Sequence, residues 1–334
     1  MSPTIKDVAK RAGVAVSTVS LVVNQKSNVS EQTREKVLNA IKDLNYHPRR
    51  SARGLVTRRS GNIGFILTED HFSLAEPFYT KIFLGTEFEA RKYDYYVLLT
   101  TIESSSKVGL IPRFLLERNV DGVILAGSVP TKLIEDIRDR NLPLVLVDYF
   151  PPRGRYSTIL IDNINGAHQA TEYLIKLGHT AIAFVGGDME HPSLYERYEG
   201  YKKALKASNL PIHNELVHIK ERYTGINDGY DAAEHLLKTG VTFSALFAAN
   251  DALAVGALRC FREHNILVPD NIAIIGFDDV EIAMNFHPKL STMSVPKEEM
   301  GALALRRVVE MINSNDISIS QTIIPVKLIT RESS

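Results

Sequence analysis

Residues 16–23 combine short hydroxyl side chains with valine and leucine. They belong to the stretch TIKDVAKRAGVAVSTVSLVVN (residues 4–24), in which two short apolar-periodic segments flank Gly13. Serine and threonine hydroxyls can bond several base edges in the major groove of DNA, and valine or leucine can contact a thymine methyl group. The second segment could therefore read DNA bases. The alternative interpretation is an amphipathic helix with a small polar face and no ligand.

The next unusual stretch is rich in arginine. HPRRSARGLVTRRSG (residues 47–61) contains five arginines, at positions 49, 50, 53, 58 and 59. Residues 1–60 hold twelve Lys and Arg against four Asp and Glu, a formal charge of +8, and the remainder of the chain carries −8. A basic head on an acidic body suggests that the head binds a polyanion. A solvated, flexible basic linker is the alternative for the arginine-rich stretch itself.

Three short helices are expected to position these residues. Thr4 with Asp7 three residues later is a variant of the capping box that begins a helix. Gly13 supplies a turn, and Ser30 is suited to cap a third helix that ends at Asn45. Two short helices joined by a glycine turn, with a third helix to bury them, form a helix-turn-helix unit.

Residues 4–24 together with VSEQTREKVLNAIKDLNYHP (residues 29–48) resemble the lactose-repressor (LacI/GalR) family of bacterial transcription regulators. The resemblance is dense here and extends more loosely to residue 331. It implies that the DNA-binding residues of the head are Thr4, Val16, Ser17, Thr18, Ser20, Leu21, Asn24, Ser30 and Thr33. Within this set it implies base reading by Val16, Ser17 and Leu21, and backbone contacts by Thr4, Ser20, Asn24, Ser30 and Thr33.

Two features of the second helix depart from the family pattern. Ala15 stands where the family usually has serine, which removes an N-cap worth about 0.5–2 kcal/mol and a phosphate contact. The outer face also lacks Arg and Gln, so it offers no bidentate contact to guanine or adenine. Specificity is expected to depend on apolar and hydroxyl contacts.

In the family, the segment that matches RRSARGL folds into a hinge helix only on operator DNA. Two such helices enter the minor groove, where a leucine at the position of Leu55 wedges between base steps. The resemblance assigns Ala52 to close helix approach and adds Arg53 to the DNA-binding set. Gly54 weakens this helix by about 0.5–1 kcal/mol relative to alanine, and Arg49 replaces a common asparagine. We expect the hinge to be unfolded in the free protein and marginally helical on DNA.

The body alternates near-continuous apolar runs with helical patterns, which predicts parallel sheets covered by helices on both faces. The chain is thus expected to be an α/β protein with a two-lobed, periplasmic-binding-protein-like body of doubly wound sheets. Strands are expected at 61–67, 95–101, 122–127, 143–148, 157–162, 181–187, 216–222, 245–250 and 272–279. The predicted domains are a head (1–48), a hinge and linker (49–60), an N-terminal lobe (61–161 plus about 293–322) and a C-terminal lobe (162–292 plus about 323–331).

A cleft between two such lobes, at the carboxyl ends of strands, is the expected ligand site. The motifs SLYERYEGYKKAL, AANDALAVGAL and IIGFDD resemble family segments there. The effector-binding residues that the resemblance implies are Phe78, Tyr79, Asp148, Tyr149, Asp162, Arg197, Tyr223, Asn250 and Asp278. Acceptors for hydroxyls, a guanidinium fork and stacking rings favour a sugar. A nucleobase or a phosphorylated protein corepressor remains open.

The sequence lacks the common motifs of enzymes. It contains no G-x-G-x-x-G after a strand, no G-x-x-x-x-G-K-[ST], no G-x-S-x-G and no H-E-x-x-H. One cysteine excludes a cysteine-rich metal site and an internal disulfide. We expect no catalysis, no cofactor and no metal, although an enzyme on the same scaffold is a distant alternative.

The expected partners follow from the head and the termini. The head reads one half-site, so a homodimer on pseudo-palindromic double-stranded operator DNA is expected. The chain ends at RESS without a leucine-heptad tail. The absence of a signal-peptide pattern and of any membrane-length apolar run predicts a cytoplasmic protein with no membrane partner. A sugar-binding transport protein is the other distant alternative.

Overall fold

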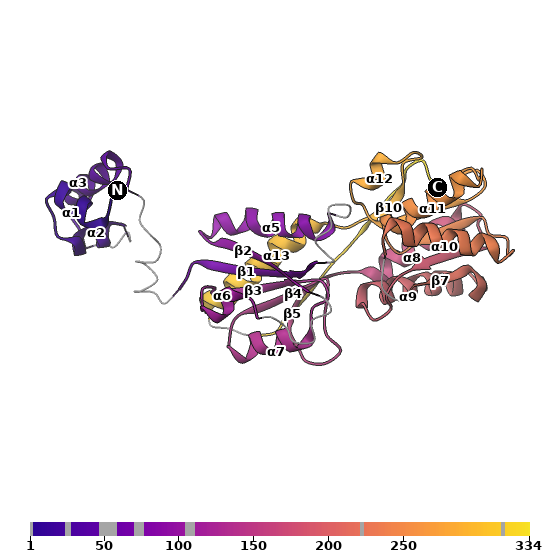
Figure 1. The fold of residues 1–334 in the computed structure, drawn as a ribbon, viewed down its shortest axis with the longest axis horizontal. Coiled ribbons are helices and arrows are strands. Elements are labelled where there is room, and N and C mark those ends of the chain that lie inside the picture. The colour runs from indigo at the N-terminus through magenta and orange to yellow at the C-terminus, as the bar shows by residue number, and fades with distance from the viewer. Residues whose placement is uncertain are drawn as a thin grey trace. The chain divides into compact units, whose positions relative to one another are not determined.

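The computed structural model describes residues 3–23, 28–46, 59–69, 77–103, 111–220, 224–314 and 318–334. The chain divides into two compact units, Met1–Gly61 and Asn62–Ser334, which we call the head and the body. Figure 1 shows the three helices of the head and the strands and helices of the body.

The head consists of α1 (Ile5–Ala12), α2 (Val16–Val23) and α3 (Glu31–Asp43). The predicted capping box is confirmed, since the Thr4 amide donates to Asp7 Oδ2 at 2.8 Å. Gly13 ends α1 in the left-handed conformation, with φ +68°, which costs glycine little because it has no Cβ. The predicted Ser30 cap is confirmed, and Asn45 has the expected positive φ of 46°.

A small apolar core holds the three helices together. Val8, Val19, Val22, Val37 and Tyr46 are all buried in it. Val19 and Val22 lie three residues apart and therefore share one side of α2. The other side of this helix is left for contacts outside the core.

The first sheet of the body has the strand order β11-β5-β4-β3-β1-β2, and its strands pair in parallel. Its strands are β1 (Asn62–Thr68), β2 (Tyr96–Ile102), β3 (Gly122–Ala126), β4 (Leu144–Val147), β5 (Ser157–Ile161) and β11 (Gln321–Ile324). The helices around it are α5 (Phe78–Lys92), α6 (Arg113–Leu116), α7 (Thr131–Asp139) and α13 (Lys297–Ser314). Helices α5 and α13 pack together over one face, and α7 covers the other (Figure 1).

The second sheet has the order β12-β10-β9-β8-β6-β7, with β12 antiparallel to β10. Its strands are β6 (Ile182–Gly186), β7 (Val217–Ile219), β8 (Ala245–Ala248), β9 (Ala273–Asp278), β10 (Ser291–Ser294) and β12 (Lys327–Ile329). The elements around it are α8 (Asn163–Lys176), α9 (Pro192–Ala207), a 3-10 turn (Asn214–Leu216), α10 (Ile226–Lys238), α11 (Asp251–Glu263) and α12 (Ile282–Asn285).

The burial of the strands explains why their sequences read as continuous apolar runs. Every residue of β3, β4, β5, β6 and β8 is buried, as expected for parallel strands covered on both faces. The predicted parallel α/β class is therefore confirmed. None of the helices within the described ranges is long and apolar enough to cross a membrane.

The expected strands and lobe boundaries differ from the structure at three places. Strand β7 covers Val217–Ile219, whereas a strand was expected over 216–222, of which 221 and 222 lie outside the described residues. Strand β11 pairs with β5 of the first sheet up to Ile324, so the boundary predicted near residues 322 and 323 falls inside this strand. Strand β10 continues to Ser294, where it pairs with Asp278 of β9, so the boundary predicted near residue 293 falls inside the second sheet. The chain leaves that sheet at Val295–Pro296, just before α13 begins to pack on the first sheet.

Candidate functional sites

The outward side of α2 carries the residues predicted to read bases. Successive residues of an α-helix are about 100° apart, so Val16, Ser17, Ser20 and Leu21 fall within about 140° of one another. Val16 is 41% exposed and Leu21 is 38% exposed, so both large apolar side chains reach the surface of the helix. We call this surface the reading face. Its exposed valine and leucine are available to contact thymine methyl groups.

The residues predicted to contact the DNA backbone include two helix caps. Thr4 precedes α1, and its hydroxyl donates to Asp7 Oδ2 at 2.7 Å. Ser30 precedes α3, and its hydroxyl lies 2.9 Å from that of Thr33. The N-terminus of a helix presents free amide N–H groups and a partial positive charge, both of which favour phosphate. Thr18 lies beside the reading face, toward the core.

Five predicted site residues lie outside the described residues. They are Asn24, Ala52, Arg53, Leu55 and Tyr223. The segment expected to form the hinge helix, residues 49–55, also lies outside the described residues.

In the body, one group of predicted residues meets around Asp148, directly after β4. The Tyr79 hydroxyl donates to Asp148 Oδ2 at 2.9 Å, and the Ser193 hydroxyl donates to Asp148 Oδ1 at 2.8 Å. Tyr79 belongs to α5 over the first sheet, whereas Ser193 belongs to α9 beside the second. The carboxylate therefore receives one hydrogen bond from each lobe. All three side chains are buried.

A second group meets around Arg197 of α9, which is only 3% exposed. Its Nε donates to Asn163 Oδ1 at 2.9 Å and its Nη1 donates to the carbonyl of Ala249 at 2.7 Å. Its Nη2 lies 2.9 Å from Asp278 Oδ1 in an ion pair. This contact does not have the geometry of a hydrogen bond, so Arg197 and Asp278 interact there as an ion pair alone. The guanidinium also lies 3.8 Å from the centre of the Phe277 ring.

Burial dominates the electrostatics of these two groups, which we together call the interlobe site. Burial raises the pKa of the Asp278 carboxyl, although the charges of Arg197 and Lys297 act to lower it. Burial and the nearby charge of Asp148 hold the pKa of the Tyr79 hydroxyl well above its ordinary value. Tyr79 is therefore a neutral donor near neutral pH. A neutral donor, a guanidinium and two carboxyl groups form a set that suits a ligand rich in hydroxyls.

The remaining predicted residues surround these groups. Phe78 packs edge-on against Tyr79, with ring centres 5.1 Å apart, and the Tyr149 ring lies 6.1 Å from that of His191. Asp162 caps α8 through the amide of Asn165. Asn250 caps α11 and donates from its Nδ2 to the carbonyl of Thr224, so its amide already has partners at both ends.

Four residues at or beside the interlobe site were not predicted as ligand contacts: Asn163, His191, Ser193 and Glu196. Ser193 and Glu196 lie within the motif SLYERYEGYKKAL, from which only Arg197 was selected. Their spacing held a signal, because Ser193, Glu196 and Arg197 repeat at helical intervals along α9. Glu196 accepts a bond from Asn163 Nδ2, and burial raises the pKa of its carboxyl. Burial lowers the pKa of His191, whose Nδ1 is buried without a hydrogen-bond partner.

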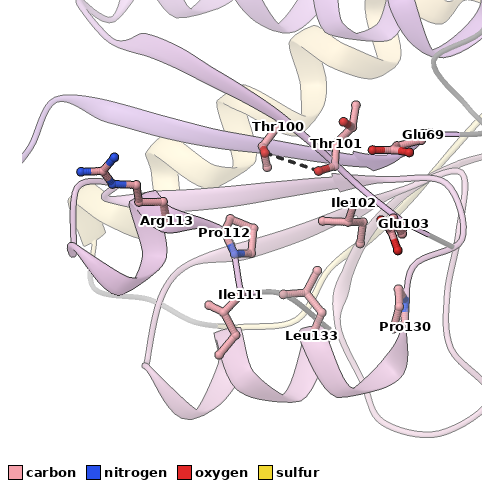
Figure 2. Close-up of a pocket in the computed structure, with 10 residues that line it drawn as sticks. All are labelled: Glu69, Thr100, Thr101, Ile102, Glu103, Ile111, Pro112, Arg113, Pro130 and Leu133. Atoms are coloured by element: carbon pink, nitrogen blue, oxygen red, sulfur yellow. Dashed lines mark hydrogen bonds between the residues drawn. The ribbon is translucent and has the colours of Figure 1, made fainter. Parts of the chain in front are cut away.

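Two hollows lie apart from the interlobe site. Figure 2 shows a cavity of about 250 Å³ at the carboxyl ends of β1 and β2, lined by residues that include Glu69, Thr101, Glu103 and Arg113. An open groove of about 610 Å³ lies along β7 and α10, beside His218 and His235. None of the described residues that line these hollows was predicted as a ligand contact.

A helix-turn-helix head joined to a body with a buried polar site at the strand ends of two α/β lobes defines a DNA-binding regulator controlled by a ligand. Residues 4–49 match the profile "Bacterial regulatory proteins, lacI family" and residues 171–334 match "Periplasmic binding protein-like domain". The chain is 34% identical over 336 residues to the HTH-type transcriptional regulator RegA of Clostridium saccharobutylicum, covering 100% of this chain and 99% of that protein.

The solved structures that resemble the whole chain include the following two. One is the lac repressor dimer bound to operator and the anti-inducer ONPF, with a TM-score of 0.85, 27% identity and coverage of 100% of this chain and 99% of that chain. The other is the transcriptional regulator CelR in complex with cellobiose, with a TM-score of 0.77, 30% identity and coverage of 99% and 100%. The chain belongs to the LacI family of bacterial regulatory proteins. It is a DNA-binding transcriptional regulator.

Proposed function

We propose that this regulator represses transcription as a homodimer on a pseudo-palindromic operator, and that a carbohydrate in the interlobe site controls its affinity for DNA. The observation that carries the ligand assignment is the buried group of Arg197, Asp278 and Asp148 with the Tyr79 hydroxyl at the strand ends of both sheets. Sugar hydroxyls both donate and accept, so they can replace the contacts that these groups make with one another. The cellobiose complex of the related CelR supports the same ligand class.

The coupling to DNA follows from the contacts that join the lobes. Ser193 of α9 donates to Asp148 after β4, so a ligand that competes for this carboxylate changes the balance between lobe arrangements. A ligand can shift such an equilibrium only by binding one arrangement more tightly than the other. The two arrangements differ in whether the paired hinges can fold on DNA, which is the allosteric step.

On DNA, the reading face is assigned to the major groove and the caps at Thr4 and Ser30 to flanking phosphates. Leu55 is assigned to the minor groove at the centre of the operator, where its insertion kinks the duplex. Leu55→Ala is expected to weaken operator binding and to reduce the bend measured by fluorescence energy transfer between labelled DNA ends. Unchanged affinity and bend would refute the wedge.

The homodimer is assigned to the side of the body formed by α5 and β2. Strand β2 is an edge strand of the first sheet. Tyr96 on β2 is 62% exposed and Phe88 on α5 is 53% exposed, with Leu84 and Leu99 also exposed. Exposed apolar side chains on an edge strand and the helix beside it are suited to an interface with a second copy. Phe88→Glu is expected to yield monomers in sedimentation velocity, with weaker operator binding because one head reads one half-site.

Fluorescence anisotropy on the DNA upstream of the protein's own gene tests the effector assignment. Operator binding is titrated with mono- and disaccharides, sugar phosphates and purines. A sugar that shifts operator affinity in the wild type, but not in Arg197→Met, supports the proposal and gives the sign of regulation. A response to a purine instead would assign the site to a nucleobase, and no response to any compound would favour a phosphorylated protein corepressor.

The proposal includes no catalytic step. The relatives reported above are transcriptional regulators. A protein that reads chromosomal DNA acts in the bacterial cytoplasm, and we assign this chain there. Incubation of the purified protein with the sugar that it binds, followed by chromatography, is expected to return the sugar unaltered.

A further inference from the structure

The turn that ends β9 has an unusual backbone. Asp278 has a φ of +109° and the next residue, Asp279, has a φ of +54°. Residues other than glycine rarely adopt such angles, and they keep them only where surrounding contacts impose them. Since the Asp278 side chain forms the ion pair with Arg197, the contacts that hold this turn also set the direction of a central carboxylate of the interlobe site.

Several of these contacts come from the second lobe itself. Asp251 Oδ2 accepts a hydrogen bond from the amide of Val280 at 2.9 Å, and Arg331 Nη2 lies 2.6 Å from Asp279 Oδ1. They fix the far side of the turn, beyond Asp278. The Asp278 carbonyl accepts a long hydrogen bond from the Val295 amide, at 3.4 Å, whereas neither the Asp251 nor the Arg331 contact reaches the Asp279 carbonyl.

Lys297 supplies a donor to both carbonyls. Its ammonium donates to the carbonyls of Asp278, Asp279 and Val295, the last two at 3.2 and 3.1 Å. An ammonium carries three N–H donors, so this one is fully used by backbone carbonyls. Lys297 is only 3% exposed, although lysine is seldom buried. A charge held at such a position requires a compensating interaction.

The position of Lys297 in the chain links the two lobes. It is the first residue of α13, which packs on α5 and on strands of the first sheet, whereas its three carbonyl partners lie at the ends of β9 and β10 in the second sheet. Its Nζ also lies 5.8 Å from the ring centre of Phe78, another predicted ligand contact. Burial lowers the pKa of Lys297, and the carboxylate of Asp278 acts to raise it.

We propose that Lys297 is a positioning residue for the effector site: by holding the strained Asp278–Asp279 carbonyls, it keeps the Asp278 carboxylate directed toward Arg197 and the ligand. This inference rests on the proposed function of the interlobe site. It assigns Lys297 no direct contact with the effector. Its loss should therefore resemble the loss of Asp278 itself.

The first test needs no effector. Crystal structures of wild type and Lys297→Met are compared, because methionine retains the length of the side chain but not the ammonium. The expected result is that Asp278 leaves the positive-φ region and that the separation of Arg197 Nη2 and Asp278 Oδ1 increases. An unchanged φ and an unchanged ion pair in the variant overturn the proposal. If Lys297→Met does not fold, Lys297→Gln undergoes the same comparison.

The second test measures binding of cellobiose, and of any compound that responds in the anisotropy screen, by titration calorimetry. Lys297→Met and Asp278→Asn are each expected to weaken binding at least tenfold, and the double variant no more than Asp278→Asn alone, since both act through one carboxylate. Lys81→Met is the control, because Lys81 is a part-exposed lysine 4.0 Å from Glu298. It should change affinity less than twofold.

The outcomes separate the two proposals. Independent losses that multiply in the double variant would make Lys297 a general structural residue and overturn the inference. If no compound binds the wild type, the carbohydrate proposal fails, and the crystallographic comparison alone decides whether Lys297 positions Asp278.

Discussion

The reading face of the head and the interlobe site of the body hold their side chains in opposite ways. On α2, Val16 and Leu21 are exposed, and the core is formed by the other side of the helix. In the body, Arg197 and Asp148 are buried and bonded to their neighbours. The head therefore separates stability from recognition, whereas the body uses the same side chains for both.

The largest effect that would test this comparison is expected at Arg197. Arg197→Met leaves Asp278 without its partner and removes the donors to Asn163 and Ala249. Breaking a buried ion pair costs about 3–5 kcal/mol of unfolding free energy. Urea unfolding of the body measures it, and Arg197→Met/Asp278→Asn should recover part of the loss. A cost below about 1 kcal/mol, the range of exposed pairs, would contradict the coupling of site and stability.

The second effect concerns the reading face. Leu21→Ala should weaken operator binding by about 1–3 kcal/mol, because an apolar contact with the DNA is lost. The unfolding free energy should stay within about 0.5 kcal/mol, since the side chain lies outside the core. Leu38→Ala on α3, where Leu38 is also exposed, is the matched control and should alter neither quantity. Equal losses of DNA affinity in the two variants would remove the assignment of the reading face.

A gain is expected at the start of α2. Ala15 precedes the helix, and its carbonyl accepts from the amides of Thr18 and Val19, but its methyl group cannot cap the free N–H groups. Ala15→Ser should stabilise the head by about 0.5–2 kcal/mol and strengthen operator binding through a phosphate contact. Hydrogen exchange of the α2 amides and anisotropy measure the two effects. Ala15→Val, which also lacks a capping oxygen, should produce neither gain.

The smallest effect is a dependence of the body's stability on pH. Burial holds the pKa of His191 below its ordinary 6.5 in the folded state. As the pH falls through 6.5, the unfolded chain binds a proton that the native ring does not, so the unfolding free energy decreases until the lowered native pKa is reached.

Urea unfolding at pH 7.5 and 5.5 measures this decrease. His191→Gln should show a smaller decrease than wild type, which separates His191 from His179 and His218, whose pKa values are also lowered by burial. The three helices of the head should respond less, because residues 1–46 contain no histidine. An equal decrease in the two proteins would mean that His191 does not contribute.

Local patterns predicted the elements well because local interactions form them. The Thr4–Asp7 capping box, the Gly13 turn and the Ser30 cap depend on residues within a few positions of one another. The strands of the body were recognisable because strands buried on both faces must be apolar throughout. The strand expected over 216–222 extended past the apolar residues into Lys220, whereas β7 ends at Ile219.

Local sequence patterns could not predict which side chains the candidate ligand residues contact. Arg197 and Asp278 lie 81 positions apart, and Asn250 is engaged in capping α11. Ser193 and Asn163 were missed because their roles exist only through contacts with Asp148 and Arg197. Lys297 drew no attention in the sequence, where a lysine is ordinarily an exposed surface residue.

The amino-acid sequence by itself determined the helix-turn-helix head and the parallel α/β body, because periodicity, caps and apolar runs are patterns of neighbouring residues. The family came from the resemblance of whole motifs, which also supplied the candidate ligand residues at the strand ends. The tertiary structure alone decided that Asp148 is bonded from both lobes, that Arg197 contacts Asn163, Ala249 and Asp278, and that the Lys297 ammonium meets the carbonyls of the turn at Asp278. The physical reason is that burial and pairing depend on which distant segments the fold brings together, and charge and hydrogen bonding are then set by those neighbours.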